Sequence, residues 1–128
     1  MKKIIALLLV LITIGFTFNA SAQKEEINSV HLFDLDGQLE PRYLAYIKKL
    51  NAVIKQIGYP KSYYSVFRVK ADDNADKYRY CEIGHWTNEA DYKAIHENAK
   101  FLAQKEEEKK NAVYINEQLY RRYYSVGQ

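Results

Sequence analysis

The chain has 128 residues, 48% of them hydrophobic, and carries 19 Lys and Arg against 16 Asp and Glu. Lys2 and Lys3 belong to a segment that we expect to be removed, which leaves 17 basic and 16 acidic residues and a formal charge of +1. This balance gives no electrostatic reason to expect nucleic acid or an anionic membrane as a partner. Cys81 is the only cysteine, so a disulfide bond within the chain is excluded.

Residues 1–22 have the three parts of a secretory signal. Lys2 and Lys3 form a basic start, Ile4–Phe18 is an almost unbroken apolar run, and Ala20-Ser21-Ala22 offers small residues for cleavage after Ala22. The apolar run is shorter than the roughly 20 residues that span a bilayer. We therefore expect a periplasmic or secreted protein that is free of the membrane, with residues 23–128 as a single domain.

The first part of the mature chain predicts a strand followed by a helix. The strand is Val30–Leu35, and Asp36-Gly37 is a turn signal after it. Pro41 suits the first turn of a helix, and Gly58 can adopt the left-handed conformation that ends one. The helix is indicated by an apolar stripe at steps of three and four residues, made of Tyr43, Ile47, Leu50, Ile54 and Ile57.

The second part predicts a hairpin, a helix and a last strand. The strands are Tyr63–Val69, Tyr78–Trp86 and Leu119–Val126, and Thr87 or Asn88 is expected to cap the second helix. That helix has the stripe Tyr92, Ile95, Ala99 and Leu102, and its charged run at 105–110 is interpreted as a solvated helical face. The order β-α-β-β-α-β predicts an α+β ferredoxin-like fold, with a four-stranded antiparallel sheet and both helices on one face.

The other face of this sheet has no cover within the chain, and the alternation of strand residues divides the side chains between the two faces. The smaller apolar residues, among them Phe67, Cys81 and Ile83, are assigned to the side under the helices. The opposite set is amphipathic and is assigned to the uncovered side. With Tyr92 from the second helix, it supplies the predicted ligand-pocket residues Tyr64, Arg68, Tyr80, Glu82, Trp86, Tyr92 and Tyr123.

Tyr and Trp combine a large apolar body with one hydrogen-bonding tip, so such a face favours coverage by a second subunit or by a small ligand. The alternative is that tyrosine fills these strands only because of its β propensity. Arg68 and Glu82 are interpreted either as an anchor for an acidic or hydroxylated ligand or as a salt bridge across the sheet or the dimer interface. The whole interpretation requires that Tyr64, Tyr80 and Trp86 do not lie beneath the chain's own helices.

The three histidines, His31, His85 and His96, have no spacing typical of a metal site, and neither a metal nor a cofactor is predicted. Each histidine can have a purely structural role. If one of them is catalytic, it would act as a general base near neutral pH. The candidates are His96 and His31, with Tyr64 or Tyr80 orienting a substrate.

The segment from Tyr80 to Trp86, followed by Glu89-Ala90, His96 and Phe101, resembles the dimeric α+β barrel superfamily, in particular the antibiotic-biosynthesis-monooxygenase-like and NIPSNAP-like domains. The resemblance covers Val30 to Val126 by the order of elements. It implies a homodimer in which two sheets pack face to face, with a pocket between the sheet and the helices of each subunit.

The superfamily includes cofactor-free oxygenases and haem-degrading enzymes, so the fold does not fix the function. The haem-degrading enzymes carry an Asn on the first strand and a Trp and a His on the second helix. This pattern is matched poorly, because Asn28 precedes the predicted first strand and Trp86 precedes the helix. The first hypothesis is therefore an exported binding or accessory domain for a small apolar or aromatic ligand. The alternatives are a cofactor-independent monooxygenase-like enzyme acting on such a molecule and a haem-binding protein.

Overall fold

The computed structural model describes residues 25–70, 77–110 and 118–126. The predicted signal at 1–22 and most of the predicted turn at 71–77 lie outside these ranges. In chain order the elements are β1 (Ile27–Phe33), the 3-10 turn η1 (Gly37–Leu39), α2 (Glu40–Gln56), β2 (Tyr63–Arg68), β3 (Tyr80–Trp86), α3 (Glu89–Glu97), α4 (Ala99–Lys110) and β4 (Gln118–Tyr124).

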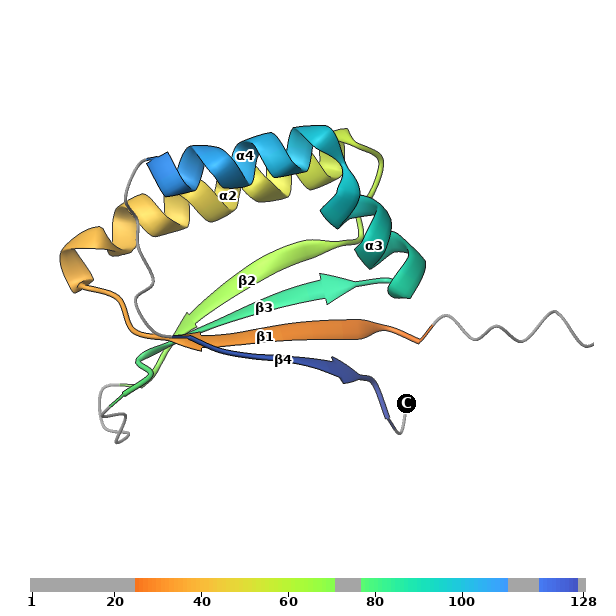
Figure 1. Cartoon of the computed structure of the whole chain (residues 1–128). Helices are drawn as coiled ribbons and strands as arrows, with labels where there is room; N and C mark the ends of the chain where they lie inside the picture. Colours follow the sequence, from red (N-terminus) through yellow and green to blue (C-terminus); the bar gives the residue numbers. More distant parts are fainter. Residues whose placement is uncertain (1–24, 71–76, 111–117, 127–128) are drawn as a thin grey trace, which may run out of the picture.

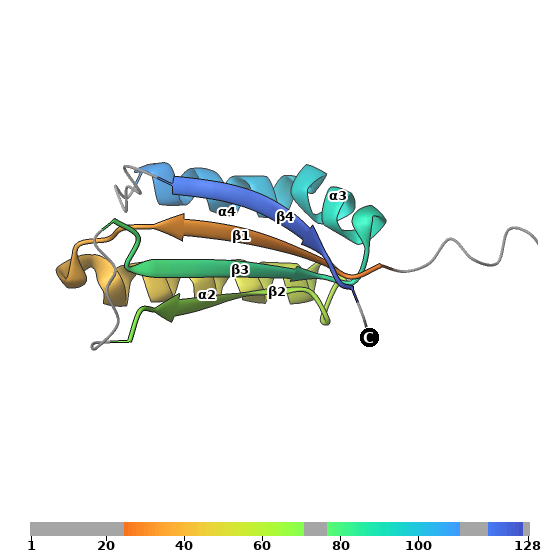
Figure 2. The same ribbon diagram turned by 90° about the horizontal axis from the view of Figure 1, so that it is seen from below.

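The strands form one antiparallel sheet in the order β2-β3-β1-β4, with β1 between β3 and β4. All the helices lie on one side of this sheet (Figure 1). From below, the four strands lie in front of the helices and no other element covers them (Figure 2). We call this second side the open face. The arrangement confirms the predicted ferredoxin-like fold.

Helix α2 forms as its apolar stripe predicts. Its buried residues are Tyr43, Tyr46, Ile47, Leu50 and Ile54, and these residues are part of the core between helices and sheet. Gly58 follows the helix with a φ of 102°, a left-handed conformation that costs glycine little. The predicted stop is confirmed.

The second predicted helix is interrupted in the structure. Asn88 caps α3 as predicted, accepting a hydrogen bond from the Asp91 backbone. Asn98 is extended, and its side chain accepts a hydrogen bond from the Lys100 backbone at the start of α4. This second cap turns the chain between α3 and α4, so that Phe101 is fully buried while the stripe residue Leu102 is exposed.

The assignment of side chains to the two faces was wrong. Tyr64, Tyr80, Glu82 and Trp86 are buried on the side beneath the helices, whereas Phe67 is exposed and Cys81 and Ile83 are half-buried on the open face. The amphipathic residues can be buried because each polar tip has a polar neighbour from another segment of the chain. The predicted pocket and dimer therefore lose the basis that the alternation pattern gave them.

The free edge of the sheet at β2 is partly closed by α2. The Val69 backbone N–H donates to Arg79, just before β3, so the backbone of Tyr64, five residues earlier, points away from β3. The Asn51 side chain on α2 forms hydrogen bonds with both backbone groups of Tyr64. Its oxygen accepts from the Tyr64 N–H at 2.7 Å, and its nitrogen donates to the Tyr64 carbonyl at 2.9 Å. Such cover protects an edge strand from pairing with other chains.

Within the described ranges, no helix combines the length and the apolar character needed to cross a membrane.

Gly84 allows the Trp86 ring to lie close against β3. A Cβ at this position would lie 2.5 Å from both Ser29 Oγ and Trp86 Cζ2. We therefore expect Gly84→Ala to lower the free energy of unfolding by about 1–3 kcal/mol, measured by urea denaturation. Gly37→Ala is the matched control, because a Cβ there meets nothing within 4 Å, and equal stability of the two variants would contradict the prediction.

Candidate functional site

Four side chains on the helix-covered side of the sheet form a row across all four strands. The strand register places Val66, Glu82, His31 and Tyr120 directly opposite one another in turn. Three of the four are polar, although this side of a sheet is normally filled with apolar groups. The row is therefore the most informative place to look for a function.

Glu82 is the buried end of this polar row. Only 6% of the residue is exposed, and its Oε2 accepts a hydrogen bond of 2.5 Å from the hydroxyl of Tyr43 on α2. His31 Nδ1 lies 3.9 Å from the other carboxylate oxygen. A carboxylate removed from water needs such partners, and the ones found here come from a helix and a neighbouring strand.

His31 is partly open to solvent although it lies on an inner strand and on the covered side. Its side chain keeps 27% of its surface exposed. The imidazole ring is edge-on to Tyr120, with 4.6 Å between the ring centroids. The described elements around His31 therefore leave part of its ring accessible to solvent.

Tyr120 continues the polar surface toward α3. Its hydroxyl lies 3.0 Å from the hydroxyl of Tyr92, and Arg122, which pairs with Glu89, lies over the Tyr92 ring. Burial, together with the hydrogen bond to Tyr92, raises the pKa of Tyr120, so this hydroxyl stays protonated at physiological pH. We call Tyr43, Glu82, His31, Tyr120 and Tyr92 the inner cluster.

His96 lies beside the inner cluster in a cage of aromatic rings. Tyr92, Trp86 and Phe101 lie within 4.1 to 5.1 Å of its ring centroid. Its Nδ1 lies 2.7 Å from the Tyr92 carbonyl, which can only accept, so Nδ1 carries the proton. In the neutral ring Nε2 is then an acceptor, and the Tyr64 hydroxyl lies 3.4 Å from it. Both ring nitrogens thus have a protein neighbour.

Trp86 lies at the bottom of the same cage. Its indole N–H donates to Ser29 Oγ at 3.0 Å, and its ring is edge-on to both Tyr64 and Tyr92. It is the only tryptophan in the chain, so its fluorescence reports on this region.

Arg68 and Tyr80 lie apart from the inner cluster, at the edge of the sheet. Both donate to Glu40 Oε2, Arg68 at 2.9 Å and Tyr80 at 2.7 Å. The salt bridge between Arg68 and Glu82 that the sequence suggested is therefore wrong: in the register, Arg68 is opposite Tyr80 and Glu82 is opposite Val66. The Tyr80 hydroxyl is directed to Glu40 on α2 and not to His31 or His96.

Tyr123 is on the opposite side from the other predicted pocket residues. It is exposed on the open face, in register with Asn28 of β1. Asn28 separates it from His85, which is opposite Asn28 on β3. Tyr123 therefore cannot contribute to a site between this subunit's own sheet and helices.

The sequence interpretation missed Tyr43, Tyr120, Ser29 and Glu40. Tyr43 was recognised only as an apolar stripe residue, although a buried tyrosine hydroxyl needs a partner and its stripe faces the sheet. Tyr120 and Ser29 follow from strand register, which a single sequence does not give. Among the described residues, no group of three or more His, Cys, Asp or Glu could hold a metal ion.

No model of a known protein family matches the chain, and no curated protein is significantly similar to it. Solved structures do resemble it. SnoaB, a cofactor-independent oxygenase from Streptomyces nogalater, is 14% identical, with 80% of this chain and 95% of that one covered and a TM-score of 0.57. Hydroxynitrile lyase from Passiflora edulis is 13% identical, with 82% of this chain and 97% of that one covered and a TM-score of 0.58.

A third solved structure is a dimeric ferredoxin-like protein of unknown function from Thermobifida fusca, 13% identical, with 84% of this chain and 97% of that one covered and a TM-score of 0.54. At such identities the similarity concerns the fold and not the activity. The chain therefore has a ferredoxin-like fold, as the resemblance in its sequence implied.

His96 is expected to be neutral at physiological pH. Burial lowers its pKa, against the opposing effect of the hydrogen bond to the Tyr92 carbonyl. We expect its NMR titration midpoint to lie below the ordinary value of 6.5. Because the unfolded chain then binds a proton before the folded one, His96 makes the free energy of unfolding fall as the pH drops below about 6.5. In His96→Gln this fall should be smaller, and a midpoint above 6.5 would contradict the prediction.

Proposed function

We propose that this protein is an exported homodimer that binds a small apolar or aromatic molecule between the sheet and helices of each subunit, against His31. The observation that carries the proposal is the partly exposed His31 in register between a buried carboxylate and a tyrosine. A few convergent polar groups beside aromatic rings are typical of small-molecule sites. The export is inferred from the signal-like residues 1–22.

The inner cluster indicates what such a ligand would contact. Two tyrosine hydroxyls that share one hydrogen bond leave one O–H free to donate, so Tyr92 and Tyr120 can bind a ligand oxygen. The Tyr120 and His31 rings offer apolar edges next to it. The site therefore suits a molecule with an aromatic or alicyclic body and a carbonyl or hydroxyl oxygen.

The homodimer is inferred from the open face. Its register forms a row of Phe67, Cys81, Leu32 and Leu119 beside a row that contains Ile83 and Val30. Phe67 and Leu119 are exposed, and no helix covers them. Apolar patches of this kind mark protein interfaces, and the similar protein from Thermobifida fusca is dimeric.

Catalysis is the second candidate function. The carboxylate of Glu82 lies behind His31 and can stabilise its protonated form, an arrangement that suits a general base. His96 suits this role less well, because its ring lies in a cage of aromatic side chains and not beside a carboxylate. The similar solved structures include an oxygenase and a lyase, so proton abstraction from an acidic C–H is the step we propose rather than a specific overall reaction.

Ile83 lies on an inner strand of the open face, opposite Val30 and Ser65. We expect Ile83→Glu to convert the dimer into a monomer at micromolar concentration, because two carboxylates would be buried in the interface. Sedimentation equilibrium measures this. Leu102→Glu, at an exposed site on α4, is the control and should remain dimeric. A monomeric parent protein would contradict the proposed assembly.

The ligand site can be tested with 2-tetralone, an aromatic ketone with exchangeable α-protons. We expect it to change Trp86 fluorescence and, if His31 acts as a base, to exchange its α-protons in D₂O about 10²-fold or more faster than in buffer. NMR follows the exchange. His31→Gln should abolish the acceleration.

His85→Gln is the matched control, because His85 lies on the same sheet but faces away from the helices. Binding without exchange would support a binding protein and refute the base. If the dimeric protein shows no binding and no exchange, the case for the inner cluster as a site for aromatic ketones is lost.

A further inference from the structure

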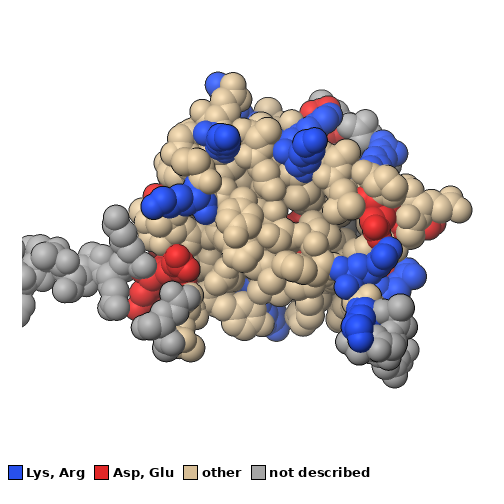
Figure 3. Space-filling view, turned by 180° about the vertical axis from the view of Figure 1, so that it is seen from behind, with Lys and Arg blue, Asp and Glu red and all other residues tan. Residues whose placement is uncertain are grey.

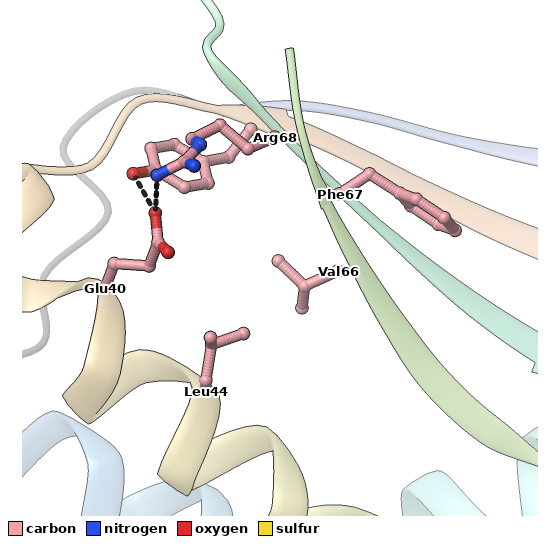
Figure 4. Close-up of a pocket in the computed structure, with 6 residues that line it drawn as sticks. Glu40, Leu44, Val66, Phe67 and Arg68 are labelled. Atoms are coloured by element: carbon pink, nitrogen blue, oxygen red, sulfur yellow. Dashed lines mark hydrogen bonds and ion pairs between the residues drawn. The ribbon is translucent and has the colours of Figure 1, made fainter. Parts of the chain in front are cut away.

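A cavity lies at the edge of the sheet, beside the inner cluster. It has a volume of about 140 Å³ and is lined by Glu40, Leu44, Val66, Phe67, Arg68 and Tyr80. Figure 4 shows Leu44 of α2 and Val66 of β2 facing each other across it, with Glu40 and Arg68 at one end. We call this cavity the edge pocket.

The polar end of the edge pocket is electrically balanced. Glu40 Oε2 accepts from both Arg68 and Tyr80, and burial is the main cause that raises the pKa of Tyr80 and keeps its hydroxyl protonated. The other Glu40 oxygen accepts no hydrogen bond from the described residues, and in Figure 4 it points toward the space between Leu44 and Val66. The pocket therefore offers one unused acceptor within a neutral ion pair.

The rest of the edge pocket is apolar and accessible. Leu44 is 44% and Phe67 is 52% exposed. Figure 3 shows this side of the molecule: the charged side chains lie mainly around its rim, and uncharged ones cover its centre. A cavity of about 150 Å³ with apolar walls is large enough for a benzene ring. The edge pocket thus has room for one six-membered ring.

We propose that the edge pocket binds a neutral single-ring molecule that carries one hydroxyl group, of the size of phenol. The ring packs between Leu44 and Val66, and the hydroxyl donates to the unused oxygen of Glu40. A hydrogen bond to a carboxylate is stronger than one between neutral groups. An anion would meet Glu40 unfavourably, and an ammonium group would compete with Arg68 for the carboxylate.

The edge pocket borders the inner cluster at Glu82, which is opposite Val66 and two residues after Tyr80 on β3, but it is remote from Trp86. Tyr80, which lines the edge pocket, and Trp86, which lies beside His96, are at opposite ends of β3. At about 3.3 Å per residue they are separated by about 20 Å. A ligand in the edge pocket is therefore expected to leave Trp86 fluorescence unchanged, whereas one at the inner cluster should alter it.

The test is an NMR titration of the ¹⁵N-labelled mature chain with phenol. We expect millimolar binding, with the shifts concentrated on the first turns of α2 and on β2. Anisole, which has the same ring but no donor, should bind at least fivefold more weakly, and so should benzoate and benzylamine. Equal binding of phenol and anisole would overturn the role of Glu40.

Two variants separate this site from nonspecific binding. Leu44→Trp should fill the cavity and weaken phenol binding at least fivefold. Leu102→Trp, on α4 with 46% exposure, is its control and should leave binding unchanged. Glu40→Gln should weaken phenol binding several-fold but leave anisole unaffected.

Unchanged phenol binding in Leu44→Trp would overturn the proposal, as would shifts that map to Tyr92, His96 and Trp86. The latter result would instead support the inner cluster as the ligand site. The two proposals can therefore fail separately.

Discussion

The buried carboxylate of Glu82 constrains the helix-covered side of this protein. A carboxylate that loses its water must receive hydrogen bonds from the protein, and here Tyr43 donates one from α2. Since Tyr43 belongs to the stripe that packs α2 on the sheet, this bond also restricts how the helix can rotate over the strands. Buried ionic groups seldom improve stability compared with apolar residues of similar size. The general base proposed for His31 would give this buried carboxylate a role besides its contribution to folding.

The two faces of the sheet carry different sets of side chains and are therefore suited to different contacts. The helix-covered face holds rings whose polar tips have partners from distant segments, as in the Trp86 bond to Ser29. The open face holds the apolar side chains of Val30 and Ile83 on its inner strands, and polar or aromatic residues such as Tyr123 lie around them. A face of the second kind is suited to packing against another apolar surface. A face of the first kind is suited to orienting a ligand, because each ring is fixed by its own hydrogen bond.

The sequence was sufficient to predict that each strand exists, the stop at Gly58 and a cap at Thr87 or Asn88, because those signals are local. The first strand was placed too late, since β1 runs from Ile27 to Phe33 and not from Val30 to Leu35. The sequence was insufficient for the faces of the sheet. Alternation separates Tyr64 from Phe67, but it does not say which of them lies under the helices. Ranking them by polarity failed, because the hydroxyl of Tyr64 has its neighbour on α3, and such a partner is invisible in a local pattern. The break at Asn98 was missed for a related reason, since a stripe that continues through an asparagine resembles one helix.

The strand register brings His31, Glu82 and Tyr120 side by side. A shift of β1 by one residue relative to its neighbours would move His31 to the open face and separate it from Glu82 and Tyr120. Gly84 favours the observed register, because only a residue without a Cβ leaves room for Ser29 and the Trp86 ring beside it. The register and the helix packing also give two histidines different chemistry. His96 is held between Tyr92 and Tyr64, whereas His31 reaches solvent in front of a carboxylate. The position of each histidine in the fold therefore decides its exposure and its surroundings.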